Sequence, residues 1–95
     1  MVKQQDLIGT WKIDPTSSDA YGNVNMTFDE DGGLKYSVHE NGKEQIMLLR
    51  YFVDGDFLVT DQPSSPRRER TKITIDGQKM TLDYEGKISS YTRVD

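Results

Sequence analysis

The chain is organised around the stretch Leu7-Ile8-Gly9-Thr10-Trp11-Lys12-Ile13-Asp14, which holds the only tryptophan in 95 residues. A period of two places Leu7, Gly9, Trp11 and Ile13 on one face of a strand. This pattern suits a closed sheet, because the glycine lets the strand bend and the indole fills the bottom of the closed sheet. We expect Trp11 to be structural, since truncating a buried tryptophan typically costs about 3–5 kcal/mol. The total stability expected for this length is only about 5–14 kcal/mol.

Seven further apolar or alternating runs follow, at intervals of 8–12 residues and separated mostly by glycine-containing turns such as Asn41-Gly42 and Asp76-Gly77. No window of eleven residues has a helical period. Eight short strands without a covering helix close most economically on themselves, which removes both sheet edges. We therefore predict one all-β domain over 1–95, a small eight-stranded antiparallel up-and-down (meander) barrel without a substantial helix. The expected strands are Leu7–Asp14, Val24–Phe28, Leu34–His39, Glu44–Val53, Phe57–Thr60, Arg67–Ile75, Met80–Tyr84 and Lys87–Val94.

The fourth run, Glu44–Val53, is apolar on both faces. If Met47, Leu49, Tyr51 and Val53 point inward, then Ile46, Leu48 and Phe52 point outward, unless a bulge changes the parity midway. A strand that is apolar on both sides is either covered by another element or offered to a partner. The outward set Ile46, Leu48 and Phe52 is therefore a candidate interface, and a homodimer is one expectation.

Gly9-x-Trp11 on the first strand and Tyr91-x-Arg93 on the last resemble the lipocalin-like (calycin) barrels. The order LIGTWKID, VNMTFDEDGGLKY, YFVDGDFLV, ITIDGQKMTLDY and SSYTR resembles the short bacterial lipocalin-like domains over nearly the whole chain. The resemblance implies that Arg93 packs across Trp11 and closes the barrel base, with Gly9 beside them. Such a contact is worth about 0.5–2 kcal/mol as a cation–π interaction. The chain is shorter than true lipocalins and lacks their C-terminal helix and disulfides.

An eight-stranded barrel is either filled by side chains or holds one small ligand. Four of the expected inward residues are tyrosines, Tyr36, Tyr51, Tyr84 and Tyr91, and buried phenols need hydrogen-bond partners. Tyrosines converging with Arg93 near one end would suit a small ligand with an aromatic or anionic part. The alternative is that their hydroxyls reach solvent at the rims.

Composition excludes several other functions. No cysteine is present, so thiolate chemistry and disulfides are absent, and a reducing, cytoplasmic location is expected. The first residues lack the apolar core of a signal peptide, and no stretch is long enough to span a membrane. A net charge of −4 argues against nucleic-acid binding, although basic residues gather at Arg67, Arg68, Arg70 and Lys72. A phosphate or acidic partner and protection against strand aggregation are alternative roles for that run.

No residue set has an enzymatic signature. His39 is the only histidine and has no partner by spacing, so neither a catalytic nor a metal role is expected. The acidic turns at 29–31 and 54–56 lack the spacing of a calcium loop. We predict a non-enzymatic lipocalin-like domain, without a cofactor, that binds a small, partly apolar or aromatic ligand in or at the mouth of the barrel. The alternative is a protein–protein or homodimer module with a filled barrel.

Overall fold

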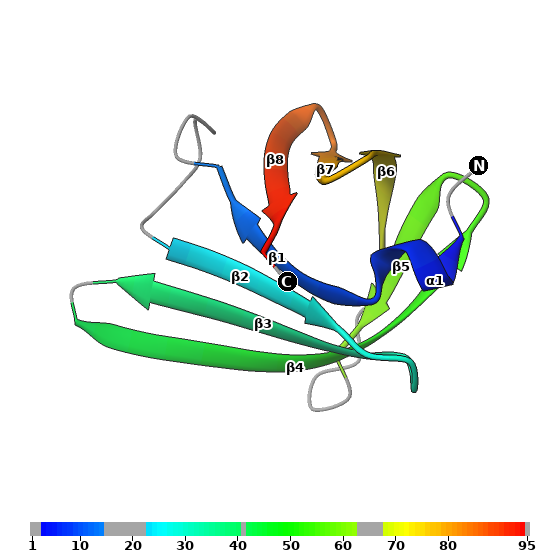
Figure 1. Ribbon diagram of the computed structural model, residues 1–95. Coiled ribbons are helices and arrows are strands. Elements are labelled where there is room, and N and C mark those ends of the chain that lie inside the picture. Colours follow the sequence, from blue (N-terminus) through cyan, green and yellow to red (C-terminus); the bar gives the residue numbers. More distant parts are fainter. Residues whose placement is uncertain (1–2, 15–22, 41, 63–67, 95) are drawn as a thin grey trace.

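The structure is a computed structural model that describes residues 3–14, 23–40, 42–62 and 68–94 (Figure 1). Residues 15–22 and Arg67 of the basic run lie outside these ranges. One short helix precedes the strands in chain order. The elements are α1 Gln4–Leu7, β1 Gly9–Ile13, β2 Asn23–Phe28, β3 Gly33–Glu40, β4 Lys43–Asp54, β5 Phe57–Asp61, β6 Glu69–Asp76, β7 Lys79–Tyr84 and β8 Lys87–Arg93.

The eight strands form a closed antiparallel barrel in which each strand pairs with its neighbours in sequence. The ring is completed where β1 pairs with β8, with Trp11 opposite Arg93 and Ile13 opposite Tyr91. The predicted up-and-down barrel without a substantial helix is therefore confirmed. No helix among the described residues has the length and apolar character needed to cross a bilayer.

The core lies inside the barrel and consists of one side of each strand, as the period of two predicts. Trp11 and Met80 are completely buried, and Phe28 and Ile73 are nearly so. Partly buried side chains surround this centre: Tyr36, Val38, Leu49, Val53 and Ile75. The remaining buried apolar residues of this core are Leu7, Ile13, Val24, Met26, Leu34, Tyr51, Leu58, Leu82 and Tyr91.

The start of the predicted first strand is wrong, because Leu7 belongs to α1 and not to β1. Its side chain is nevertheless fully buried, so the helix plugs the end of the barrel that we call the base. The chain passes from helix to strand through Gly9, whose φ of 128° is a conformation that L side chains rarely adopt. This glycine therefore permits the change of direction that brings α1 under the strands.

The hairpin of β3 and β4 extends beyond the rest of the barrel (Figure 1). Its pairing runs without interruption from Gly33 opposite Arg50 to Glu40 opposite Lys43, so no bulge changes the parity. On its other side, β4 pairs with β5 only from Arg50 to Asp54. Met47 has the parity of an inward residue but is 43% exposed, because this part of the strand has left the core. We call the segment Lys43–Leu49 the β4 arm.

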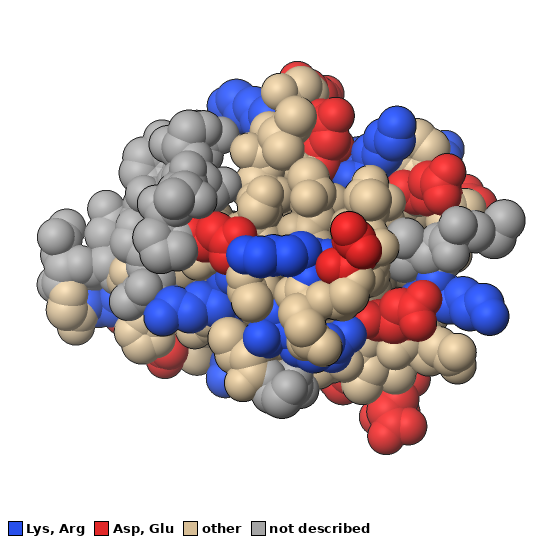
Figure 2. All heavy atoms as spheres, turned by 45° about the horizontal axis from the view of Figure 1, so that its top comes forward, with Lys and Arg blue, Asp and Glu red and all other residues tan. Residues whose placement is uncertain are grey.

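The outer wall over β4, β5 and β6 has a small apolar cluster of its own. Val59 lies between Phe52 and Arg70 in register and is only 3% exposed although it faces outward. The guanidinium of Arg70 lies 4.5 Å from the ring centre of Phe57, and that of Arg68 lies 5.8 Å from the ring centre of Phe52. Two residues of the basic run, Arg68 and Arg70, thus lie over aromatic rings. On the face in Figure 2, cationic and acidic side chains are interspersed.

Candidate functional site

A hollow of about 240 Å³ opens at the end of the barrel opposite α1, which we call the mouth. It lies where β1 ends, β2 begins and the β7–β8 hairpin turns. Three of the four tyrosines proposed as ligand contacts, Tyr36, Tyr84 and Tyr91, meet in its wall. The other lining residues are Ile13, Val24, Val38, Lys87 and Ser89.

Two of these phenols are electrostatically coupled. Burial raises the pKa of Tyr91 to about 12, and the neighbouring Tyr36 adds to the rise. Burial also raises the pKa of Tyr36, while its hydrogen bond with Tyr91 opposes that rise. A hydrogen bond with Ser89 opposes the rise for Tyr91. The mouth therefore has an apolar wall that carries a short chain of neutral hydroxyl groups at pH 7.

The expected convergence of the tyrosines on Arg93 is wrong, because Tyr51 and Arg93 lie at the base. The Tyr51 hydroxyl donates to the carbonyl of Asp29 at 2.7 Å, and its ring packs edge-on against Phe28 with centres 5.0 Å apart. Burial, followed by the charge of Asp29, raises the pKa of Tyr51. Its polar atom is thus used within the fold.

At the base, Arg93 and Trp11 form the contact that the family resemblance implies. The guanidinium of Arg93 lies 4.3 Å from the centre of the Trp11 ring. It also donates to the carbonyls of Ile8 at 2.7 Å and Asp6 at 2.6 Å, while the Trp11 indole donates to the carbonyl of Leu7 at 2.9 Å. Since these bonds satisfy the carbonyls of the helix and the turn after it, the base is closed by structural contacts.

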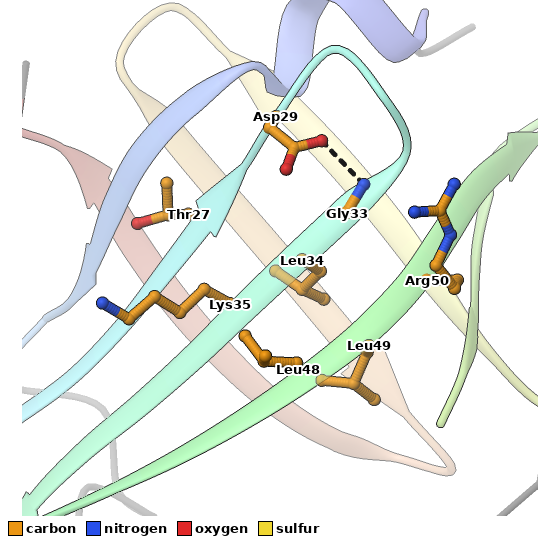
Figure 3. A pocket seen from close by; sticks show the side chains of 8 residues that line it. All are labelled: Thr27, Asp29, Gly33, Leu34, Lys35, Leu48, Leu49 and Arg50. Carbon is orange, nitrogen blue, oxygen red and sulfur yellow. Dashed lines mark hydrogen bonds between the residues drawn. The ribbon is translucent and has the colours of Figure 1, made fainter. Parts of the chain in front are cut away.

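A second hollow, of about 450 Å³, lies over β2, β3 and β4 (Figure 3). Its apolar floor includes Leu34, Leu48 and Leu49. Two of the charged groups at its edge, those of Asp29 and Arg50, already have partners. Asp29 accepts hydrogen bonds from the backbone of Asp31 and Gly33 at 3.0 and 2.8 Å. Arg50 donates to the Asp31 carbonyl at 2.7 Å. Although it is the larger hollow, its polar rim serves the turn between β2 and β3, and the mouth is the better candidate site.

The three residues of the candidate interface lie on two separate surfaces. Ile46 and Leu48 are 47% and 69% exposed on the β4 arm. Phe52 is also exposed but lies beyond Arg50, beneath Arg68 and beside the buried Val59. The apolar surface of the β4 arm is therefore separate from the aromatic cluster on the barrel wall.

His39 lies on the outer face of β3, where its imidazole contacts the carboxylate of Glu44. The pKa of Glu44 is lowered, first by the hydrogen bond from Ser37 at 3.1 Å and then by His39. Among the described residues, no three His, Cys, Asp or Glu side chains form a group that could hold a metal ion.

Sequence reasoning omitted Lys87 and Ser89 from the site. Both share the parity of Tyr91 along β8, so the signal that placed Tyr91 inward applied to them as well. Because β8 begins at the mouth, Lys87 supplies a cation at the rim of the tyrosine-lined hollow. In comparisons with known proteins, no family model, no curated protein and no solved structure matches this chain.

Proposed function

We propose that this chain is a lipocalin-like barrel that reversibly binds a small, partly apolar acid at its mouth, without catalysing a reaction. One observation carries the proposal: among the described residues, apolar side chains, three tyrosines and Lys87 meet around one hollow at the mouth. Apolar walls with a few placed polar groups are typical of small-molecule sites. Lys87 would meet the carboxylate at the rim, and the phenols would contact the ring or chain.

The size of the hollow restricts the ligand. A volume of about 240 Å³ corresponds to roughly eight water molecules at about 30 Å³ each. We therefore propose a ligand with about eight to twelve non-hydrogen atoms, such as a small aromatic acid, and not a long-chain lipid. For so few atoms we expect a Kd in the range of about 10 μM to 1 mM.

Residue-resolved NMR titration tests the proposal directly. Benzoate, phenylacetate and octanoate are added to the ¹⁵N-labelled protein, with benzamide and toluene as uncharged probes. Saturable shifts at Tyr36, Tyr84 and Ser89, with Trp11 unchanged, are the expected result. Tryptophan fluorescence is less suitable, because Trp11 is fully buried at the other end. The absence of saturable shifts at the mouth for every acid would overturn the proposal.

Two substitutions sharpen the test. Lys87→Gln should weaken binding of the acids by up to about fivefold, the range expected for an exposed ion pair, without affecting binding of benzamide. Lys72→Gln, which removes the same charge from the outer wall, is the matched control and should leave binding unchanged. Ser89→Leu should abolish binding of all probes by filling the hollow. Equal effects of Lys87→Gln and Lys72→Gln would show that only net charge matters.

A further inference from the structure

The inward residues of β8 differ in chemistry between the rim of the mouth and its interior. Lys87, Ser89 and Tyr91 alternate along this strand, and all three line the hollow. Successive inward residues of a strand are about 6.5 Å apart, so these side chains start at different depths. Lys87 is exposed at the start of β8, whereas Tyr91 is only 4% exposed. The mouth therefore has a cation at its rim and a phenol in its interior.

A third hydroxyl group, that of Tyr36 on β3, meets the two on β8. Tyr36 lines the same hollow and has a hydrogen bond with Tyr91, which also has one with Ser89. We call these three groups the hydroxyl chain. They carry three protons, and the two bonds between them use only two, whichever group donates. One O–H is thus left for another acceptor, whereas at the base the Tyr51 hydroxyl already donates to the Asp29 carbonyl.

We propose that the ligand of the mouth carries a second oxygen at the end opposite its carboxylate, as a para-hydroxylated aromatic acid does. This step rests on the function proposed above and adds the group that the interior of the site recognises. The carboxylate lies at Lys87, the ring lies against the apolar wall, and the ligand hydroxyl accepts the remaining O–H of the hydroxyl chain. The ligand hydroxyl can itself donate to a free lone pair of Tyr36 or Tyr91.

Two energetic costs select this ligand and its orientation. A carboxylate placed in the interior would lose its water without reaching the cation at the rim, and burial of an unpaired charge is expensive. An apolar group in the interior would exclude water and leave the remaining O–H without an acceptor, which costs more than an ordinary hydrogen bond contributes. An uncharged oxygen at the far end of the ring avoids both costs. The para position is favoured because it lies directly opposite the carboxylate across the ring.

A series of arylacetates tests the proposal on the unmodified chain. The NMR titration described above compares 4-hydroxyphenylacetate with 4-methylphenylacetate, which has nearly the same shape but no second oxygen. The hydroxy acid should bind about three- to tenfold more tightly, the effect of one net hydrogen bond, although the methyl acid is more apolar. 2-Hydroxyphenylacetate, whose hydroxyl lies beside the carboxylate, should show no such gain over phenylacetate. Equal or tighter binding of the methyl acid would overturn the proposal.

Substitutions that remove single oxygen atoms locate the interaction. Tyr36→Phe combined with Tyr91→Phe removes both phenolic hydroxyls, so the hydroxy and methyl acids should then bind equally well. Tyr51→Phe is the matched control, because it removes the hydroxyl of an inward tyrosine at the base. This control should keep the preference for the hydroxy acid. Amide spectra check that the variants are folded. A preference that survives the double substitution, or that Tyr51→Phe also removes, would contradict the proposed contact.

The ligand series also separates this proposal from the function on which it rests. Saturable binding of phenylacetate at the mouth, with no preference for the para-hydroxyl group, would leave the proposed function in place and overturn only the second contact. Absence of binding by every acid would overturn both. Nuclear Overhauser effects report the orientation of bound 4-hydroxyphenylacetate. Its methylene protons should lie near Lys87 and the ring protons beside its hydroxyl near Tyr91, and the reverse order would overturn the proposal.

Discussion

At the base of the barrel, the Arg93 guanidinium lies 4.3 Å from the Trp11 ring and bonds to two carbonyls. At the mouth, Tyr36, Tyr84 and Tyr91 instead surround a hollow of about 240 Å³. Both ends are lined by aromatic and cationic side chains, but only at the base are these stacked on each other and bonded to the backbone. The comparison indicates that residue type alone does not distinguish a closing contact from a binding site. The position along the barrel axis decides between them.

The largest effect should come from Trp11→Ala, which removes the centre of the base. Trp11 is fully buried, and loss of a buried tryptophan typically costs about 3–5 kcal/mol. Urea unfolding followed by circular dichroism measures the change. Tyr84→Ala at the half-buried mouth is the comparison and should cost about 1 kcal/mol. Similar losses for the two variants would contradict the difference between the ends.

Arg93→Lys should lower the free energy of unfolding by about 2 kcal/mol. The guanidinium of Arg93 lies over Trp11 and at the same time donates to the carbonyls of Ile8 and Asp6, and a lysine has no planar group that can do both. The matched control is Arg70→Lys, since Arg70 also lies over an aromatic ring, 4.5 Å from Phe57, but on the exposed wall. There we expect a change within about 0.5 kcal/mol. Denaturant midpoints of both variants measure the two changes. An unchanged free energy of unfolding for Arg93→Lys would show that the stacking does not stabilise the fold.

Tyr91 should make the mouth sensitive to alkaline pH. Its folded pKa of about 12 lies above the ordinary value of 10.0, so the folded chain keeps a proton that the unfolded chain loses. Stability from this group is complete below pH 10 and falls as the pH rises toward 12, by up to about 3 kcal/mol. Urea midpoints between pH 9 and 11 should decline less steeply for Tyr91→Phe than for the unmodified chain. Equal slopes for the two proteins would contradict this account.

The smallest effect is expected at the outside of the β1–β8 seam. The pKa of Asp14 is lowered, first by the hydrogen bond from Thr92 at 2.6 Å and then by Lys79 at 2.9 Å. Its contribution is present above its ordinary pKa of 3.8 and is lost as the pH falls through the lowered folded value. Asp14→Asn should therefore lower the Tm slightly at pH 7 and leave it nearly unchanged at pH 2. A constant difference at both pH values would exclude titration as the cause.

The eight strands and their inner faces could be predicted from the sequence, because a period of two reports directly which side chains share a face. The position of each residue along the barrel axis could not be predicted in this way. Tyr36 and Tyr51 are both inward residues, yet one lies at the mouth and the other at the base, because Tyr36 is opposite Met47 and Tyr51 lies four residues further along β4. The same limit explains why Arg93 was expected beside the tyrosines of the mouth.

Two other differences between the sequence prediction and the structure have local causes. Leu7 matches the alternation of β1 by parity but enters the core from a helical turn, which a four-residue helix is too short to reveal in the hydrophobic pattern. Met47 matches the inward parity of β4 but lies where no described strand forms an opposite wall, and it is 43% exposed. In both positions the tertiary context, and not the periodicity, decides burial.

The contacts of Arg93 also constrain the order in which the chain can fold. Its guanidinium donates to the carbonyls of Ile8 and Asp6, which lie 85 and 87 positions earlier in the sequence. During synthesis, the earlier strands can pair with one another as they emerge, but β1 has no second neighbour until β8 has been made. Such distant contacts carry a large loop-closure entropy and slow the final step. The barrel can therefore close beside Trp11 only after β8 has become available to pair with β1.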